Sequence, residues 1–143
     1  MNIHQISVFL ENRSGQLAEI TRLLADANVD IRALSIAETA DYGLARMIVD
    51  DSAKASSILL QHGDILSMTP VWAVEVPDRP GGLAELLSSL AEAHVNVEYM
   101  YSLFTHKDDC AYMVMRISDE PQFLSTLGDN SIRLMSMADL GLK

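Results

Sequence analysis

The sequence repeats part of itself 66 positions further along the chain. Residues 11–31, ENRSGQLAEITRLLADANVDI, align without gaps with residues 77–97, PDRPGGLAELLSSLAEAHVNV. Nine of the 21 aligned pairs are identical: Arg13/Arg79, Gly15/Gly81, Leu17/Leu83, Ala18/Ala84, Glu19/Glu85, Leu24/Leu90, Ala25/Ala91, Ala27/Ala93 and Val29/Val95. A match of this kind at a fixed offset indicates two copies of one structural unit. We therefore predict a first domain at residues 1–70 and a second domain at residues 71–143.

Each copy contains the same order of strand and helix patterns. Short runs rich in β-branched and aromatic residues predict strands at 4–10, 31–39, 44–50 and 65–70, and again at 71–76, 97–105, 110–118 and 132–137. Apolar residues at helical spacing follow each glycine segment, and further helices are expected at 51–63 and 119–128. The predicted fold class is α+β: two tandem ferredoxin-like βαββαβ units, each an antiparallel sheet with both helices on one face.

The junction between the copies lacks a linker rich in Gly, Ser or Pro, because ILSMTP runs almost directly into VWAVEV. We therefore expect the units to lie close together and to share a continuous strand or a combined sheet. Residues 97–117 carry apolar side chains at both alternating sets of positions, which a sheet with one solvated face does not require. This pattern predicts that the second face is covered by the other unit or by another chain, and favours a homodimer.

Composition limits the classes of function. The formal net charge of −10 counts against binding to nucleic acid or to an anionic membrane, since both need clustered Lys and Arg. No apolar run approaches the roughly 20 residues of a membrane span, and the first residues lack the features of a signal peptide, so a cytoplasmic protein is expected. Cys110 is the single cysteine, the four histidines share no ligand spacing, and no catalytic or dinucleotide motif is visible. We expect no metal, no cofactor and no enzymatic activity.

The two glycine segments allow two interpretations. In the first, they are helix starts in which Asn12 and Asp78 cap the free N–H groups and Pro80 favours the first turn. In the second, glycine lets a ligand carboxylate approach the free N–H groups of the helix, while a nearby Asn or Asp oxygen accepts a bond from an ammonium group. The second interpretation describes a site for a free amino acid. The residues by themselves leave both interpretations open.

The chain resembles ACT domains, which are small regulatory modules that bind amino acids. The βαββαβ pattern, the loops NRSGQL and DRPGGL and the helix ends ANVDI and AHVNV carry the resemblance, which covers almost the whole chain. It is similar to stand-alone tandem ACT proteins and to regulatory subunits of acetolactate synthase. The resemblance implies a ligand held between the glycine loop of one unit and the start of the second strand of another. The corresponding residues here are Asn12, Ser14, Gly15, Gln16, Leu17, Asp30 and Ile31, and Asp78, Pro80, Gly81, Gly82, Leu83, Asn96 and Val97.

The second copy matches the family pattern more closely than the first. It has the Pro80-Gly81 pair and Asn96, whereas the first copy has Ser14 in place of the proline and Asp30 in place of the asparagine. An aspartate beside a ligand carboxylate would repel it, so two unequal sites are expected.

Three functions compete. The leading one is a non-catalytic regulatory protein that senses a free amino acid and modulates a metabolic enzyme or pathway. The second is a structural subunit that has lost its ligand sites, which Asp30 favours for the first unit. The third is an enzyme or an RNA binder on the same framework, since fold does not determine function. The acidic charge counts against RNA, and the missing catalytic groups count against an enzyme.

Overall fold

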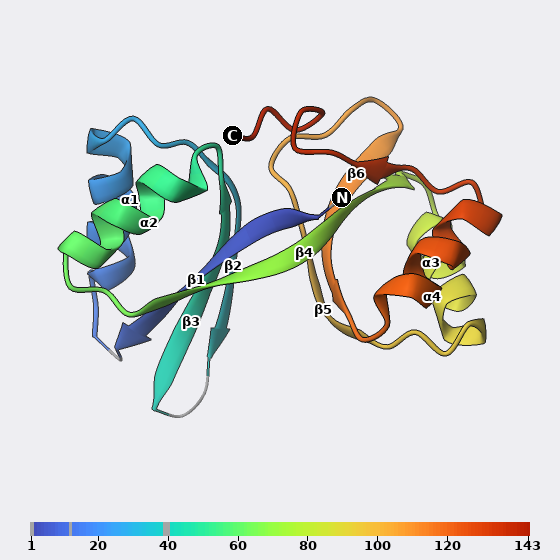
Figure 1. The fold of residues 1–143 in the computed structure, drawn as a ribbon, viewed down its shortest axis with the longest axis horizontal. Helices are drawn as coiled ribbons and strands as arrows, with labels where there is room; N and C mark the ends of the chain where they lie inside the picture. The colour runs from blue at the N-terminus through green and yellow to red at the C-terminus, as the bar shows by residue number, and fades with distance from the viewer. Residues whose placement is uncertain (1, 12, 39–40) are drawn as a thin grey trace. The chain divides into compact units, whose positions relative to one another are not determined.

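The structure, a computed structural model, describes residues 2–11, 13–38 and 41–143. The described chain forms two compact units (Figure 1). The first unit comprises His4–Pro70 together with Gly141–Lys143, and the second comprises Val71–Leu140 together with the start of the chain through Ile3. Each unit has its own hydrophobic core. The chain is thus a tandem pair of α+β units, as the repeat predicts.

The first unit follows the expected order. It contains β1 (Ile3–Glu11), α1 (Gln16–Asp26), β2 (Ile31–Glu38), β3 (Tyr42–Val49), α2 (Ser52–Gln61) and the beginning of β4 (Leu66–Pro77). The strands lie in the order β2-β3-β1-β4, and β3 is antiparallel to both β1 and β2. Both helices lie on one side of this sheet (Figure 1). The core between them is built from apolar side chains that include Ile6, Val8, Ile20, Leu24, Met47 and Leu59.

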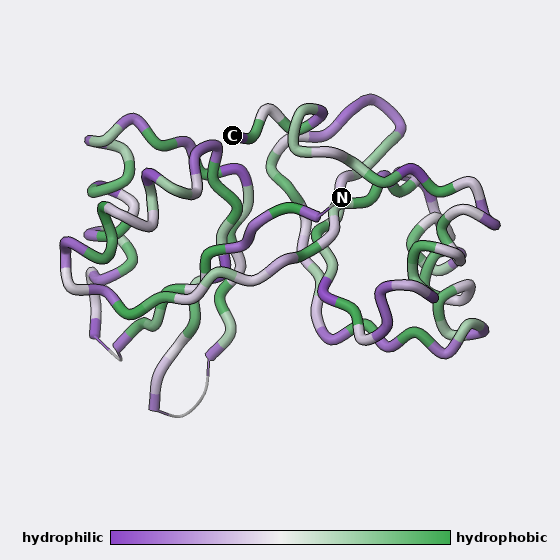
Figure 2. Tube along the Cα trace, in the orientation of Figure 1, coloured by the Kyte–Doolittle hydropathy of each residue, from purple (hydrophilic) through white to green (hydrophobic). Residues whose placement is uncertain are grey.

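The second unit repeats this arrangement. After the later part of β4 come α3 (Gly82–Glu92), β5 (Val97–Ser102), β6 (Cys110–Ile117), α4 (Glu120–Asp129) and β7 (Leu134–Met135). The strands lie in the order β5-β6-β4, and β7 pairs with β4 on its other side. The core includes Trp72, Val74, Leu86, Leu90, Met115 and Phe123. Figure 2 shows hydrophobic residues along the strands and hydrophilic ones gathered at many of the turns.

One strand continues through the junction between the units. The segments expected at 65–70 and 71–76 form the single strand β4, which passes from the first unit into the second after Pro70. On β6 both alternating sets contain buried residues, Tyr112 and Val114 on one face and Met115 and Ile117 on the other, whereas on β5 only Tyr101 is buried. The two-sided apolar pattern thus corresponds to burial on β6 only, and Phe104, after β5, is exposed.

Two strands of the second unit are clearly shorter than expected. β5 ends at Ser102, before the expected residue 105, and the expected end of the second strand at residue 39 lies outside the described residues. β7 holds only two of the six expected residues. The reason is local: the Asp139 carboxylate accepts hydrogen bonds from both the backbone N–H and the hydroxyl of Ser136, at 2.8 Å each. These bonds turn the backbone away from the strand.

The helix ends explain why Asn28 and His94 stand at equivalent places. Both residues have positive φ, of 59° and 58°, just after the last turns of α1 and α3. In α3, the N–H of His94 donates to Ala91 and that of Val95 donates to Leu90, which is the Schellman arrangement of a helix end. The chain leaves each helix sharply there and enters the next strand. Asp51 and Asp119 cap α2 and α4 through their side chains, which accept from the backbone N–H groups of Lys54 and Gln122.

Candidate functional site

The two glycine loops have nearly the same backbone. Gly15 and Gly81 are the N-cap residues of α1 and α3, with φ of 86° and 90°, and no side chain of the described residues caps either helix. Glycine is needed there because a Cβ disfavours this left-handed conformation. Pro80 lies in the turn, two residues before the first helical residue, and does not begin the helix as expected.

The expectation that Asp78 caps the first turn of α3 is wrong. The cap position belongs to Gly81, and the carboxylate of Asp78 makes no side-chain hydrogen bond within the described part of the chain. Its backbone N–H instead donates to the carbonyl of Asp109, at 2.8 Å. Asn12, the equivalent candidate in the first copy, lies outside the described residues. The first-turn N–H groups of Leu83 and Ala84 are therefore left without a capping side chain.

An arginine–glutamate pair spans each loop. The guanidinium of Arg13 donates to both carboxylate oxygens of Glu19, at 3.2 and 3.1 Å, and Arg79 holds Glu85 in the same way at 3.2 and 2.9 Å. The hydrogen bond from Arg13 lowers the pKa of Glu19, and the charge of Arg13 adds to this effect. Arginine and glutamate are identical at these positions in both copies of the repeat. This identity is a sequence signal that could have revealed the ion pairs. The pairs hold each loop against the first turn of its helix and neutralise the arginine charge.

Gly82 and Gln16 occupy equivalent first positions of the two helices and are both buried. A Cβ at Gly82 would overlap the carbonyl oxygen of Pro77. In the first unit, Gln16 turns its side-chain oxygen to the backbone N–H of Glu11, at 2.6 Å. Proline has no N–H to satisfy at the corresponding place, so the second unit needs no such side chain. The difference between Gly82 and Gln16 thus follows from packing against the preceding strand.

The starts of the second strands lie at the other ends of the helices. Asp30 and Asn96 are exposed, and each is held by backbone bonds: the N–H of Asp30 donates to the carboxylate of Asp50, and that of Asn96 donates to the hydroxyl of Ser118. An 11-residue helix separates each of them from its own glycine loop, about 16 Å at 1.5 Å per residue. The structure therefore does not bring the loop and the strand start of one unit together.

The side chains at these strand starts differ in their surroundings. The carboxylate of Asp30 lies 3.8 Å from the guanidinium of Arg32. The carboxamide of Asn96 has no hydrogen bond among the described residues and remains open to solvent. The neighbouring Ile31 and Val97 are half-buried and pack against the cores of their own units. Of the two polar candidates, Asn96 is thus the one with free hydrogen-bonding groups.

Two other kinds of site are absent from the described residues. No group of three or more His, Cys, Asp or Glu side chains is placed to hold a metal ion there. In the same part of the chain, no helix is long and apolar enough to cross a membrane.

Comparison with known proteins places this geometry in context. A family model described as an ACT domain pair matches residues 1–134. The crystal structure of protein BT0572 from Bacteroides thetaiotaomicron is 38% identical, with a TM-score of 0.90, over 99% of this chain and 96% of that one. None of the curated proteins compared with the chain matches it.

Two further structures share the fold at low sequence identity. The regulatory subunit of aspartate kinase from Thermus thermophilus has a TM-score of 0.65 at 14% identity, over 88% of this chain and 90% of that one. The corresponding subunit from Thermus flavus has a TM-score of 0.59 at 15% identity, over 90% and 92%.

Proposed function

Because the chain belongs to the ACT domain pair family, we propose that it is a non-catalytic regulatory protein that binds a free amino acid and modulates a metabolic enzyme or pathway. Residues 1–70 and 71–143 are the two proposed domains of the pair. The proposal is supported by the fold, which this chain shares with a regulatory subunit of aspartate kinase. The regulated enzyme is the proposed protein partner, and we assign no residue of this chain to contact with it.

The observation that carries the proposal is the repeated helix start without a cap. Both α1 and α3 follow a left-handed glycine, and in α3 the N–H of Gly82 donates to the carbonyl of Arg79 while those of Leu83 and Ala84 have no capping side chain among the described residues. A helix start of this kind favours an anion, because its N–H groups point outward at the positive end of the helix dipole. The Arg13–Glu19 and Arg79–Glu85 pairs fix the loops in this conformation. A ligand carboxylate fits the free donors.

Asn96 is the proposed second contact. Its free carboxamide can both donate and accept, which suits the ammonium and carboxylate groups of an amino acid. The loop and the strand start of the same unit are a helix apart, so a small ligand held by both must meet them on two different copies of the unit. In the first unit, the residue equivalent to Asn96 is Asp30, whose carboxylate can only accept hydrogen bonds and lies near Arg32. The second unit's Asn96 is therefore the better candidate.

A calorimetric screen of the twenty amino acids tests the proposal. One of them should bind, and Asn96→Ala should weaken its binding by about 1–3 kcal/mol, the cost of losing a hydrogen bond to a charged group. The fold should be unaffected, because the Asn96 side chain holds no other element. Ser88→Ala, a comparable exposed change on the outside of α3, serves as the control and should leave affinity unchanged.

One result would favour the structural-subunit alternative. In the first unit, both polar candidates already have partners within the protein. The Gln16 side chain accepts a hydrogen bond from the N–H of Glu11, and the Asp30 carboxylate lies beside Arg32. If no amino acid binds at millimolar concentration and the protein is folded, the ligand proposal is overturned. The pair would then act through its surfaces alone.

A further inference from the structure

The beginning of β4 forms an edge of the sheet in the first unit. β4 is the last strand of the order β2-β3-β1-β4, and its pairing with β6 and β7 in the second unit begins only at Trp72. Residues 66–70 therefore pair with β1 on one side, and no described strand pairs with them on the other. An edge of this kind offers its backbone groups to a further strand.

The direction of the backbone groups identifies which residues of this edge are open. The N–H of Phe9 in β1 donates to the carbonyl of Ile65, at 2.9 Å. Backbone groups alternate in direction along a strand, so every second residue from Ile65 turns towards β1, whereas Leu66 and Met68 turn their N–H and C=O groups outwards. We call residues 65–69 the open edge.

Apolar side chains flank the open edge. Ile65, immediately before β4, is 71% exposed, and Met68 is 42% exposed. The hydroxyl of Ser56 lies 3.5 Å from the sulfur of Met68, so this face of α2 lies over the strand. Leu60, four residues after Ser56 on the same helix face, is also largely exposed. A strand added to this edge would therefore cover apolar surface as well as backbone groups.

The other sheet edges carry features that hinder pairing. β2 and β5 each contain a register irregularity, near Ile31 and near Val97, and each carries charged side chains such as Arg32 and Glu98. Bulges and charged side chains are devices by which proteins protect an edge strand. β7 is only two residues long. The open edge, by contrast, contains no charged residue.

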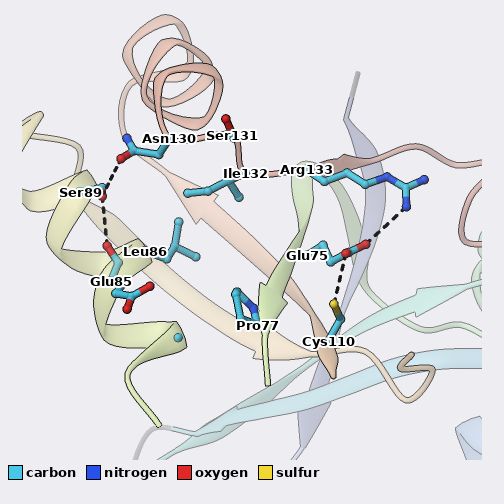
Figure 3. A pocket seen from close by; sticks show the side chains of 11 residues that line it. Glu75, Pro77, Glu85, Leu86, Ser89, Cys110, Asn130, Ser131, Ile132 and Arg133 are labelled. Carbon is cyan, nitrogen blue, oxygen red and sulfur yellow. Dashed lines mark hydrogen bonds and ion pairs between the residues drawn. The ribbon is translucent and has the colours of Figure 1, made fainter. Parts of the chain in front are cut away.

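The second unit has a charged side chain at the equivalent place. The backbone bond from Glu75 to Arg133 corresponds to the bond from Phe9 to Ile65, so Arg133 stands where the first unit has Ile65. The guanidinium of Arg133 donates to Glu75 at 3.4 Å (Figure 3) and to Asp139 at 3.1 Å. These bonds hold a charge beside the strand, whereas the first unit exposes an apolar side chain there. The open edge is thus a property of the first unit and does not come with the fold.

The charge of this region favours a second copy of the chain as the occupant. With His62 neutral, residues 52–70 contain one positive charge, Lys54, and one negative charge, Asp64, which cancel, whereas the whole chain carries −10. A twofold contact brings one patch against itself, so in an acidic protein it requires a patch without net charge. A neutral edge also has no charge by which to select a strand of a different protein.

We propose that two copies of the chain join through the open edge, with Leu66 of each copy opposite Met68 of the other and the two Ser67 residues facing each other at the twofold axis. In this register, Leu66 and Met68 form hydrogen-bonded pairs and use all of their outward N–H and C=O groups. A register shifted towards Pro70 would lose a donor, because proline has no N–H. The two first units would then share one continuous sheet, as in strand addition to a sheet edge.

The inference goes beyond the proposed function, because it uses neither the glycine loops nor Asn96. It assigns a surface to the homodimer that the sequence favours. The occupant is a second copy of this chain, and the contact is the same segment on both copies.

Disulfide trapping tests the register. Cys110 is the only cysteine, so Cys110→Ser provides a background without thiols. In this background, Ser67→Cys should form an intermolecular disulfide on oxidation with diamide, since residues opposite each other in a non-hydrogen-bonded pair have Cα atoms about 4.5 Å apart, within the range of disulfides.

Thr69→Cys is the matched control in the same background, because Thr69 lies on the same face of the same strand as Ser67. In the proposed register, the two Thr69 residues are offset along the strands by four residues, about 14 Å at 3.4 Å per residue. This variant should therefore not cross-link.

Light scattering on the protein without added cysteines gives a second measurement. Met68→Lys places like charges at the contact and should reduce the mass from that of a dimer to that of a monomer. Leu124→Lys changes a comparably exposed residue on α4 and should leave the dimer intact. Circular dichroism verifies that both variants are folded.

The outcomes decide between the open edge and other occupants. Cross-linking of Ser67→Cys but not of Thr69→Cys, with a monomer only in Met68→Lys, supports the proposal. A monomer mass for the unchanged protein, or cross-linking that is absent or equal in the two cysteine variants, would overturn it and leave the edge to a strand of another protein. A dimer that persists in Met68→Lys would overturn it as well. None of these readouts depends on amino-acid binding, so this proposal and the proposed function can fail separately.

Discussion

Gly82 packs against the carbonyl oxygen of Pro77 so closely that any Cβ at position 82 would overlap that oxygen. The contact joins the end of β4 to the first residue of α3. In the first unit, the helix starts with Gln16, whose side chain instead accepts a hydrogen bond from the N–H of Glu11. Gly82 therefore has a packing role that is independent of any ligand at the loop.

Gly82→Ala should destabilise the protein by about 1–3 kcal/mol, the usual cost of inserting a methyl group into a tightly packed place. Gly128 is the matched control, because it lies within α4 and a Cβ there meets nothing within 4 Å. Gly128→Ala should be neutral or stabilise by about 0.5–1 kcal/mol, since alanine is the better helix former. Urea unfolding of both variants measures the difference. Equal stability of the two would contradict the Pro77 contact.

Glu19 should titrate below the usual range of a glutamate, because Arg13 donates two hydrogen bonds to its carboxylate. A lowered folded-state pKa stabilises the protein above the unfolded pKa, and the stabilisation is lost as the pH falls through the folded value. NMR titration should show the pKa of Glu19 returning towards its ordinary value in Arg13→Gln. An unchanged pKa in that variant would show that the ion pair does not persist in solution.

Cys110 should alkylate more slowly than an ordinary exposed thiol, because its hydrogen bond to Glu75 raises its pKa and the thiolate is the reactive form. In Glu75→Gln the carboxylate charge is gone, so the pKa of Cys110 should fall and alkylation at pH 8 should accelerate. Glu98→Gln on β5, which loses a carboxylate paired with Arg116, is the control. If both variants react at the wild-type rate, the thiol does not contact Glu75 in solution.

The protein should self-associate as a dimer, as its sequence suggests. The apolar pattern that predicts the dimer lies in residues 97–117, where Phe104 is 60% exposed. Further large apolar side chains are exposed in the first unit, on α2 at Leu60 and just before β4 at Ile65, which are 58% and 71% exposed. Light scattering at micromolar concentration should give twice the monomer mass, and Ile65→Lys should reduce it. A monomer mass for the unchanged protein would rule out the dimer.

The sequence by itself determined the architecture, because the repeat and its apolar spacing are local properties of the chain. The tandem βαββαβ units and the helix ends at Asn28 and His94 follow from residues within a few positions of one another. The expected second helices and most strands agree with the structure for the same reason. β7 is shorter than its sequence pattern predicts, because the backbone N–H of Ser136 donates to the Asp139 carboxylate instead of to a neighbouring strand.

The tertiary structure alone decided which side chains meet. Asp78 was a reasonable cap by residue type, but the left-handed Gly81 takes the cap position and leaves the carboxylate unused. The hydrogen bonds of Glu75 to Cys110 and Arg133 could not be found from spacing, since these two residues lie 35 and 58 positions away from Glu75. They meet only because antiparallel pairing places Pro77 opposite Cys110 and joins Glu75 to the segment that contains Arg133. Such contacts depend on how the sheet folds back on itself, which no local pattern encodes.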